Sequence, residues 1–465
     1  MSKRQATTPI PEPLEKYAME FDDLFSRVNQ REGFRQYLVG LLLPAERNKT
    51  LTGLVNAEPI VGAQAARVQS LQWYLSESRW DSASVNQRRV ELLKEMPTLR
   101  PRADGALVID ETGDRKDGHK TAHVGRQYLA NLGKIDNGVV SVTSLWADER
   151  VYYPLEVEPY TPASWFEGGK TNPDFRTKLR IAVELVQRAL EQHIAFRAVV
   201  ADCFYGEDRG FRDGLEALGV GYVLALKPTH SWWHPVDSIG SLEEFARAAA
   251  WESPDRPGQW VSVIRSFRDG HQEQWWALEV IVKNAYGPEY ALRVAVVTLD
   301  PIQLPDINTW YLLTNLPAPN SARAVSSPYP PADLAELVRL YSLRTWVEQS
   351  YKQVKHTLGW AHYQVRSDLA IRRHWILVFC AFTFCWWQAA EQLTLPVPLP
   401  NAPHNAELKK SARPDPAFLA VSAPPNPRLA RTLRHAQPIL DGLFATASTP
   451  RPSAFVRRFV SGESY

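Results

Sequence analysis

The sequence is short of cysteine, of net charge and of long apolar runs, and each shortage excludes a class of protein. Its 465 residues include only Cys203, Cys380 and Cys385, which are too few and too unevenly placed for a disulfide framework or a zinc site. They suit a reducing cytosol. The most apolar run, 375–387, spans about a dozen residues, which is too short for a bilayer and predicts a buried helix. The first 17 residues contain no apolar stretch, so no signal peptide is expected.

The charge balance limits the partners that can be expected. Lysine and arginine exceed aspartate and glutamate by only two, so no chain-wide basic field indicates a nucleic acid, and any such surface must be local. The sequence has no glycine-rich phosphate loop, so ATP dependence is not expected. With 45% hydrophobic and 22% charged residues, the composition is that of a soluble globular protein of about two to four domains.

Periodicity and proline content divide the chain into five segments. The first is a helical domain that either reads DNA or serves only packing, and its nearly balanced charge leaves both interpretations open. A mixed α/β layer follows, then a β-rich insertion, a helical second part of the same core, and a Pro-rich, modestly basic tail. The predicted bounds are 1–100, 101–228, 229–330, 331–394 and 395–465.

One helix of the first segment carries specific expectations. The stretch "SVNQRRVELLKEM" opens with Ser84 and Gln87 at capping-box spacing, which predicts a helix start. On this helix Arg88, Arg89 and Lys94 are expected to point outward. The segment would then present its basic side chains to solvent.

Two predicted strands end in an aspartate. Asp110 follows "LVI" and Asp202 follows "VVA", and functional residues of α/β sheets collect at the carboxyl ends of strands. A third acid, Glu348, lies on a helix face that borders the core. Three carboxylates brought together would repel strongly, and two bound Mg²⁺ ions remove this problem in enzymes that attack a phosphodiester in line. Each acid alone is weak evidence, because a strand-end aspartate is more often a turn former, but the three together form a candidate site.

The run "YSLRTWVEQSYKQVKHTLGW" surrounds the third acid with other polar groups. Tyr341, Arg344, Glu348 and Lys355 recur at offsets of three, seven and fourteen. On a helical wheel at about 100° per residue they fall in one stripe roughly 60° wide, at the rim of the buried face. A solvated helix flank with an Arg344–Glu348 pair at i,i+4 explains the same pattern without function. The stripe therefore gains weight only beside the two aspartates.

Together these residues resemble the DDE-superfamily transposases of bacterial insertion sequences, which have an RNase H-like catalytic core. The signature of that family is Tyr, two residues, Arg, three residues, Glu, six residues, Lys. The spacings match at Tyr341, Arg344, Glu348 and Lys355. "VIDETG" and "VVADCFYG" resemble the motifs of the first and second aspartate, and "LGWAHYQVRS" resembles the segment after the glutamate. The resemblance covers roughly residues 20–390.

The resemblance implies a fold and a set of site residues. The implied fold is α/β, an RNase H-like mixed sheet flanked by helices, with a β-rich insertion and an N-terminal helical domain that can bind DNA ends. The implied catalytic residues, which are also the implied ligands of two Mg²⁺ ions, are Asp110, Asp202 and Glu348. Mn²⁺ can substitute for Mg²⁺ at such a site. The implied contacts to the DNA backbone beside the cleaved bond are Tyr341, Arg344 and Lys355.

The resemblance also implies a reaction and its partners. A DNA transposase would bind the terminal inverted repeats of its element, hydrolyse a phosphodiester and join the freed 3′-OH to target double-stranded DNA. A homodimer on paired ends, a cytoplasmic, nucleoid-associated location and no membrane association are expected. Two alternatives stay open. One is a domesticated nuclease of the same fold that cuts without joining. The other is a catalytically silent DNA-binding regulator, against which the complete acidic triad argues.

The β-rich insertion is also rich in tryptophan. It holds seven of the chain's sixteen: Trp232, Trp233, Trp251, Trp260, Trp275, Trp276 and Trp310. Most are expected in the core of the insertion. At least one is expected to face the acids and stack on a base at the DNA end, and Trp232 and Trp233 are favoured because they closely follow a core strand.

Overall fold

The computed structural model describes residues 10–44, 47–233, 239–267, 271–282 and 292–394 of the chain. By compactness the chain divides into two units, Met1–Thr383 and Phe384–Tyr465. The first unit contains every strand in the described part of the chain. The described part of the second unit is the carboxyl-terminal end of one helix. The division into five segments expected from the sequence stays a prediction.

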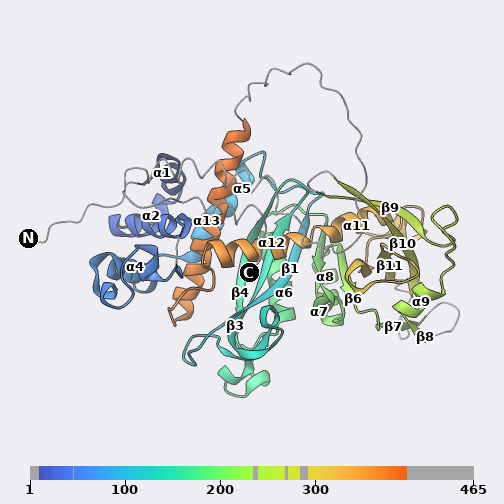
Figure 1. Ribbon diagram of the computed structural model, residues 1–465, viewed down its shortest axis with the longest axis horizontal. Helices are drawn as coiled ribbons and strands as arrows, with labels where there is room; N and C mark the ends of the chain where they lie inside the picture. The colour runs from blue at the N-terminus through green and yellow to red at the C-terminus, as the bar shows by residue number, and fades with distance from the viewer. Residues whose placement is uncertain (1–9, 45–46, 234–238, 268–270, 283–291, 395–465) are drawn as a thin grey trace, which may run out of the picture. The chain divides into compact units, whose positions relative to one another are not determined.

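The first unit is built on a sheet of ten strands in the order β2-β3-β1-β5-β6-β12-β11-β10-β9, with β4 paired to β3 (Figure 1). Its strands are β1 (Ala106–Arg115), β2 (Gly125–Leu129), β3 (Lys134–Ala147), β4 (Tyr152–Tyr160), β5 (Ala198–Ala201), β6 (Tyr222–Leu226), β9 (Val261–Ser266), β10 (Gln272–Val282), β11 (Leu292–Thr298) and β12 (Thr309–Thr314). A separate two-stranded sheet pairs β7 (Ser231–Trp233) with β8 (Ile239–Ser241).

Five strands of this sheet have RNase H-like pairing. β4, β3 and β1 are antiparallel neighbours, and β5 and β6 continue the sheet parallel to β1. The short strand β5 is buried along its whole length, which explains why it is an unbroken apolar run instead of an alternating one. The α/β fold class with a mixed sheet flanked by helices is therefore confirmed.

The four strands expected in the insertion are present as β9 to β12, and they do not make a separate sheet. β12 pairs antiparallel with β6, so that Thr314 lies opposite Val223 and Tyr311 opposite Leu226. β11, β10 and β9 then follow outward, each antiparallel to the last. The insertion therefore extends the central sheet and is joined to the core by the backbone hydrogen bonds between β6 and β12.

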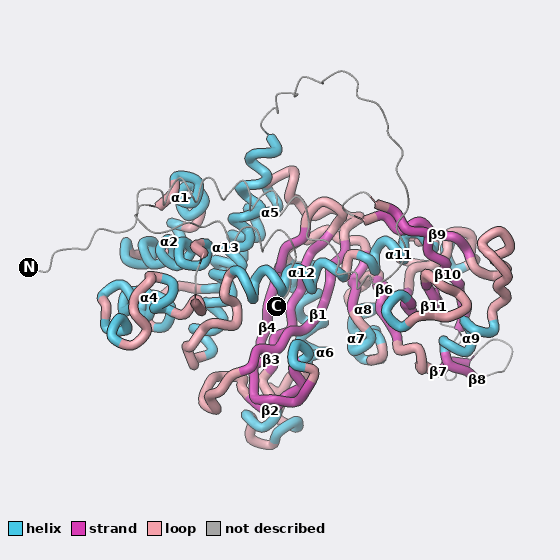
Figure 2. The backbone as a smooth tube through the Cα atoms, in the orientation of Figure 1, coloured by secondary structure: helices cyan, strands magenta, loops and turns pink. Residues whose placement is uncertain are grey.

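Helices cover the sheet and form most of the amino-terminal part. They are α1 (Glu12–Met19), α2 (Val28–Leu42), α3 (Leu51–Leu54), α4 (Ala66–Ser76), α5 (Ser82–Glu95), α6 (Lys178–Glu191), α7 (Cys203–Gly206), α8 (Arg209–Ala217), α9 (Leu242–Ala248), α10 (Arg323–Ser326), α11 (Leu334–Ser342), α12 (Thr345–Lys352) and α13 (Asp368–Thr394). Short 3₁₀ turns occupy Asp22–Leu24, Val61–Gln64, Ala130–Leu132, Ala163–Trp165, Gly169–Thr171 and Asp306–Asn308. Figure 2 shows α12 passing across the sheet, where it contacts β4 and β1, while α6 packs on β3 and β4.

Helix α5 differs from the sequence expectation in two ways. It begins earlier, because the Asp81 carboxylate caps it by accepting hydrogen bonds from the backbone N–H groups of Ala83 and Ser84. Arg89, expected to point outward, is fully buried. Its guanidinium donates to the carbonyls of Pro154 and Leu155 on β4, so the charge is taken up by backbone acceptors of the sheet. The outward placement of Arg89 is wrong, because a helical wheel contains no information on β4, which packs against this face of the helix.

Helix α13 is the apolar helix predicted for residues 375–387, and it is buried as expected. It is long and apolar enough to cross a membrane by length and composition, but 89% of that stretch is buried, as in a core helix. Trp375 stacks on Trp360, with ring centroids 4.9 Å apart. Tyr37 of α2 hydrogen-bonds His374 at 2.8 Å, so α13 holds the amino-terminal helices against the core.

Candidate active site

The register of two parallel strands brings Asp110 and Asp202 level. Val108 of β1 pairs with Val200 of β5. Asp110 lies two residues after Val108, and Asp202 lies two residues after Val200. Asp110 remains within β1, opposite Thr143 of β3, and is 9% exposed. The two acids therefore lie side by side, but only Asp202 follows the end of its strand; β1 continues to Arg115, so the expectation that it ends at Asp110 is wrong.

Asp202 is held by the helix that follows β5. One of its carboxylate oxygens, Oδ1, accepts a hydrogen bond of 3.0 Å from the backbone N–H of Phe204, which makes Asp202 the N-cap of α7. This is the capping role expected of a strand-end aspartate. The other oxygen is left for the site, where it faces Arg344.

Arg344 joins all three predicted acids. Its Nη2 atom lies 3.7 Å from Asp110 Oδ2 and 3.8 Å from Asp202 Oδ2, and its Nη1 atom lies 3.5 Å from Glu348 Oε1. The two aspartate oxygens share one nitrogen, so they lie no farther apart than those two distances added together. The structure thus gathers the three carboxylates around one guanidinium, although each contact is longer than a tight charged hydrogen bond.

The negative charges of the three acids exceed the positive charge of Arg344. Burial, reinforced by Asp202 and opposed by Arg344, raises the pKa of Asp110 to about 7. Burial alone would lower the pKa of Arg344, but the nearby acids and Tyr341 raise it above its usual value. Three acids meet a single cation, and the cluster therefore attracts further positive charge.

The donor set suits a hard divalent ion. Carboxylate oxygens are the ligands that Mg²⁺ and Mn²⁺ prefer. In the part of the chain that the structure describes, no three His, Cys, Asp or Glu side chains form a ready-made metal cluster. Here the carboxylates contact Arg344 instead, so a metal ion and the guanidinium would compete for the same oxygens. The residues fit a metal site in chemistry and proximity once Arg344 moves aside.

Tyr341, the first residue of the signature, packs against the sheet extension. Its ring meets Trp310 of β12 edge-on, with centroids 5.1 Å apart, and burial raises the pKa of its hydroxyl to about 12. Trp310 in turn packs on Trp275 of β10. Trp310 is therefore the tryptophan of the insertion that these contacts link to the signature, whereas the side chains of Trp232 and Trp233 lie outside the described residues.

The other tryptophans of the insertion are mostly core residues. Trp260, Trp275 and Trp276 are 2%, 1% and 6% exposed, and Trp251 packs edge-on against Trp276. Large aromatic side chains supply much of the buried apolar area of a core.

Lys355, the last residue of the signature, lies apart from the acid cluster. Its Nζ atom is 2.7 Å from Asp114 Oδ1 and 3.0 Å from the carbonyl oxygen of Gly113. The single helix assumed by the wheel is wrong. α11 ends at Ser342, α12 begins at Thr345, and the turn Gln353–Thr357 is π-helical. The extra residue of a π turn changes the direction of every later side chain.

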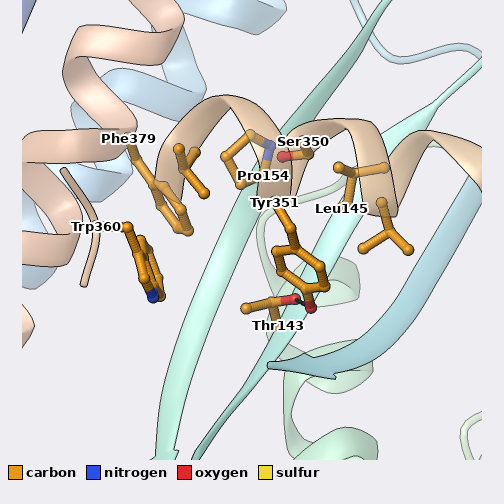
Figure 3. Close-up of a pocket in the computed structure, with 9 residues that line it drawn as sticks. Thr143, Leu145, Pro154, Ser350, Tyr351, Trp360 and Phe379 are labelled. Atoms are coloured by element: carbon orange, nitrogen blue, oxygen red, sulfur yellow. Dashed lines mark hydrogen bonds between the residues drawn. The ribbon is translucent and has the colours of Figure 1, made fainter. Parts of the chain in front are cut away.

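The structure adds residues that the sequence reasoning missed. Tyr351 of α12 hydrogen-bonds Thr143 of β3 through its hydroxyl at 2.5 Å, and both residues line a small, mostly apolar cavity together with Trp360 and Phe379 (Figure 3). Thr143 Oγ1 also donates to the Asp110 carbonyl at 3.4 Å. Asp114, a buried acid four residues after Asp110 on β1, shares a face of that strand with Asp110.

Comparison with known proteins agrees with this architecture. Residues 20–271 match the family described as "DDE superfamily endonuclease", and residues 176–384 match "Transposase DDE domain". The first match alone covers more than half of the chain. The chain therefore belongs to the DDE superfamily.

A named relative narrows the class to insertion-sequence transposases. The chain is 32% identical over 367 residues to the "Probable transposase for insertion sequence element IS701" of Microchaete diplosiphon. That alignment covers 78% of this chain and 85% of the relative. The resemblance drawn from the sequence motifs is confirmed.

Proposed function

We propose that this transposase binds the terminal inverted repeats of its element, hydrolyses a phosphodiester there and joins the freed 3′-OH to target double-stranded DNA. The observation that carries the proposal is the convergence of Asp110, Asp202 and Glu348 on one guanidinium. Such a cluster is costly for folding, because three acids facing one cation leave negative charge uncompensated. A site that must recruit divalent cations accounts for that cost.

The three acids are proposed as ligands of two Mg²⁺ ions, for which Mn²⁺ can substitute. When bound, such ions supply Lewis-acid activation of the attacking oxygen and stabilisation of the leaving oxygen. Water is the nucleophile of the first step and the 3′-OH is that of the second. Asp110 is fixed inside the sheet, whereas the Glu348 side chain is 60% exposed and can adjust as the site fills.

Tyr341, Arg344 and Lys355 are proposed as the backbone contacts beside the cleaved bond, with Lys355 keeping its ion pair to Asp114. Arg344 would exchange its carboxylates for a phosphate, which a guanidinium grips bidentately. Two element ends must be paired during transposition, so a homodimer on DNA is the proposed assembly. The proposed place of action is the cytoplasm, on nucleoid DNA.

The substitution Glu348→Gln tests the proposed chemistry. It removes a ligand oxygen and leaves the phosphate contacts in place, so cleavage in Mg²⁺ should be abolished while binding of end DNA stays nearly intact. Cleavage is measured on labelled end duplexes, and joining is measured with pre-cut ends. Glu243→Gln is the matched control, because Glu243 is also a helical acid paired with an arginine at i,i+4.

The same assays separate the alternatives. A wild-type protein that cuts but never joins pre-cut ends would be a domesticated nuclease. One that binds ends and does neither would be a catalytically silent regulator. Loss of DNA binding by Glu348→Gln as large as its loss of cleavage would contradict the ligand role of Glu348.

A further inference from the structure

A second acid of β1 is buried next to the candidate site. Asp114 lies four residues after Asp110, and side chains two and four residues apart on a strand share one face. Asp114 is 3% exposed, and a buried carboxylate is tolerated only when it is paired. Its Oδ1 atom is 2.7 Å from Lys355 Nζ, while its Oδ2 atom is buried without a hydrogen-bond partner among the described residues. Lys355 is thus its one strong partner in the described part of the chain.

This ion pair fixes one end of the helical run that carries Glu348. At the start of the run, Arg344 meets Asp110. In the middle, Tyr351 hydrogen-bonds Thr143 of β3. At the far end, Lys355 reaches Asp114 and the Gly113 carbonyl from the π-helical turn. The run is therefore held at three points along the same pair of strands.

We infer that Asp114 is a positioning residue: through Lys355 it fixes the end of the helical run and so determines where the Glu348 carboxylate stands relative to Asp110 and Asp202. The π turn makes the pair important, because it interrupts the regular i→i−4 hydrogen bonding of the helical run just where Lys355 makes its contact. Without the Asp114 carboxylate, Lys355 loses its ion pair and the turn loses its anchor. This inference rests on the proposed function, since it assumes that the three acids bind metal together.

The test compares Asp114→Asn with Asp117→Asn. Asp117 lies three residues further on, is 90% exposed and pairs only loosely with Arg115, so it undergoes the same chemical change without an anchoring role. Mn²⁺ affinity is measured by titration calorimetry on the full-length protein without DNA. Asp114→Asn is expected to lose about 10- to 100-fold in Mn²⁺ affinity, as supporting residues around metal ligands typically do, whereas Asp117→Asn is unchanged.

Three further variants distinguish the positioning role from a loss of fold. Lys355→Met should weaken Mn²⁺ binding to the same extent, and the double variant Asp114→Asn with Lys355→Met should be no worse than either single one, because all three break one contact. Asp114→Glu keeps the charge and the pair but shifts the anchor, and it should fold with wild-type thermal stability and still bind Mn²⁺ more weakly.

The competing role for Asp114 is to keep Lys355 in an ion pair, and so away from phosphate, until DNA binds. In that case Asp114→Asn would free Lys355 for a phosphate, and end DNA would bind more tightly with a steeper salt dependence in metal-free buffer. The positioning role requires unchanged DNA affinity, so tighter DNA binding would overturn it. Wild-type Mn²⁺ affinity in Asp114→Glu, or in a folded Asp114→Asn, would overturn it as well.

A reference variant separates this inference from the proposed function. If wild-type protein and Glu348→Gln bind Mn²⁺ equally, the acids are not a shared metal site and the proposed function fails. If Glu348→Gln loses Mn²⁺ affinity and Asp114→Asn does not, the metal site stands and only the positioning role of Asp114 is wrong.

Discussion

At the scale of single residues, Arg344 dominates the candidate site. Its guanidinium contacts Asp110, Asp202 and Glu348 at 3.5–3.8 Å, so it is the counter-ion that keeps three acids together in the free protein. A divalent ion offers the same oxygens a higher charge. Under the proposed function, metal binding would therefore be coupled to the release of Arg344, and the released guanidinium would be free to bind phosphate.

Arg344→Gln should lower the melting temperature of the metal-free protein and raise its affinity for Mn²⁺. Without metal, three acids lose their shared cation, so the melting temperature should fall. Added Mn²⁺ should restore it more than in the wild type, because the competing cation is gone and Mn²⁺ binds more tightly. Thermal unfolding across a Mn²⁺ titration measures both effects. Arg339→Gln on α11, which removes a partly exposed pair with Glu149, is the control and should not alter the Mn²⁺ dependence. Weaker Mn²⁺ binding in Arg344→Gln would contradict the competition.

At the scale of elements, the sequence predicts those parts of the site that are set by residues close together in the chain. Asp110 and Asp202 each follow a run of apolar residues, and the parallel pairing of β1 with β5 then brings them level without further information. The contacts of Arg344 and Lys355 depend on how one helical run breaks at 343–344 and turns at 353–357. A wheel treats that run as uniform, so it places Lys355 beside Glu348 when the fold places it at Asp114.

Glu158 illustrates another contact between elements that no local pattern reveals. Near the end of β4, its carboxylate contacts Arg176 at 2.6 Å, Arg188 of α6 at 3.3 Å and Arg372 of α13 at 2.9 Å. Burial would raise the pKa of Glu158, but Arg372 and Arg176 lower it to about 2. The sheet, α6 and the start of α13 are thus joined at one ionised carboxylate.

The pH dependence of stability should report this junction. The folded pKa of Glu158 lies below its unfolded value, so the stabilisation is complete above about pH 4.5 and is lost as the pH falls toward about 2. The shift corresponds to about 3 kcal/mol. Glu158→Gln should lower the free energy of urea unfolding at pH 7 by an amount of that order and should flatten its fall between those pH values. Glu149→Gln, at a half-exposed acid, should keep the wild-type slope. An unchanged slope in Glu158→Gln would show that the arginines do not depend on this acid.

At the scale of the whole molecule, the sheet and α13 join segments that look separate in the sequence. The insertion extends the core sheet through the β6–β12 pairing. The amino-terminal helices contact β4 through Arg89 and the start of α13 through Tyr37. Composition alone left open whether those helices read DNA or pack. The buried contacts favour packing, because a mobile reading domain would not bury a charge in the neighbouring sheet.

Arg89→Met tests whether the amino-terminal helices and the core unfold together. Removing the guanidinium takes this buried donor from the Pro154 carbonyl and leaves the Leu155 carbonyl with only the Asn86 amide, which should lower the free energy of unfolding by about 3 kcal/mol. Urea unfolding is followed by tryptophan fluorescence and by far-UV circular dichroism, and the two curves should shift together as one transition.

Arg88→Met is the matched control for that experiment. Arg88 is the next residue on α5 but pairs with Asp23 at a largely exposed site, so its loss should cost no more than about 1 kcal/mol. If Arg89→Met instead produced a separate early transition while the rest of the protein kept its wild-type midpoint, the amino-terminal helices would be an independent domain. They could then move relative to the core, and the interpretation of this segment as a reader of DNA ends would regain its support.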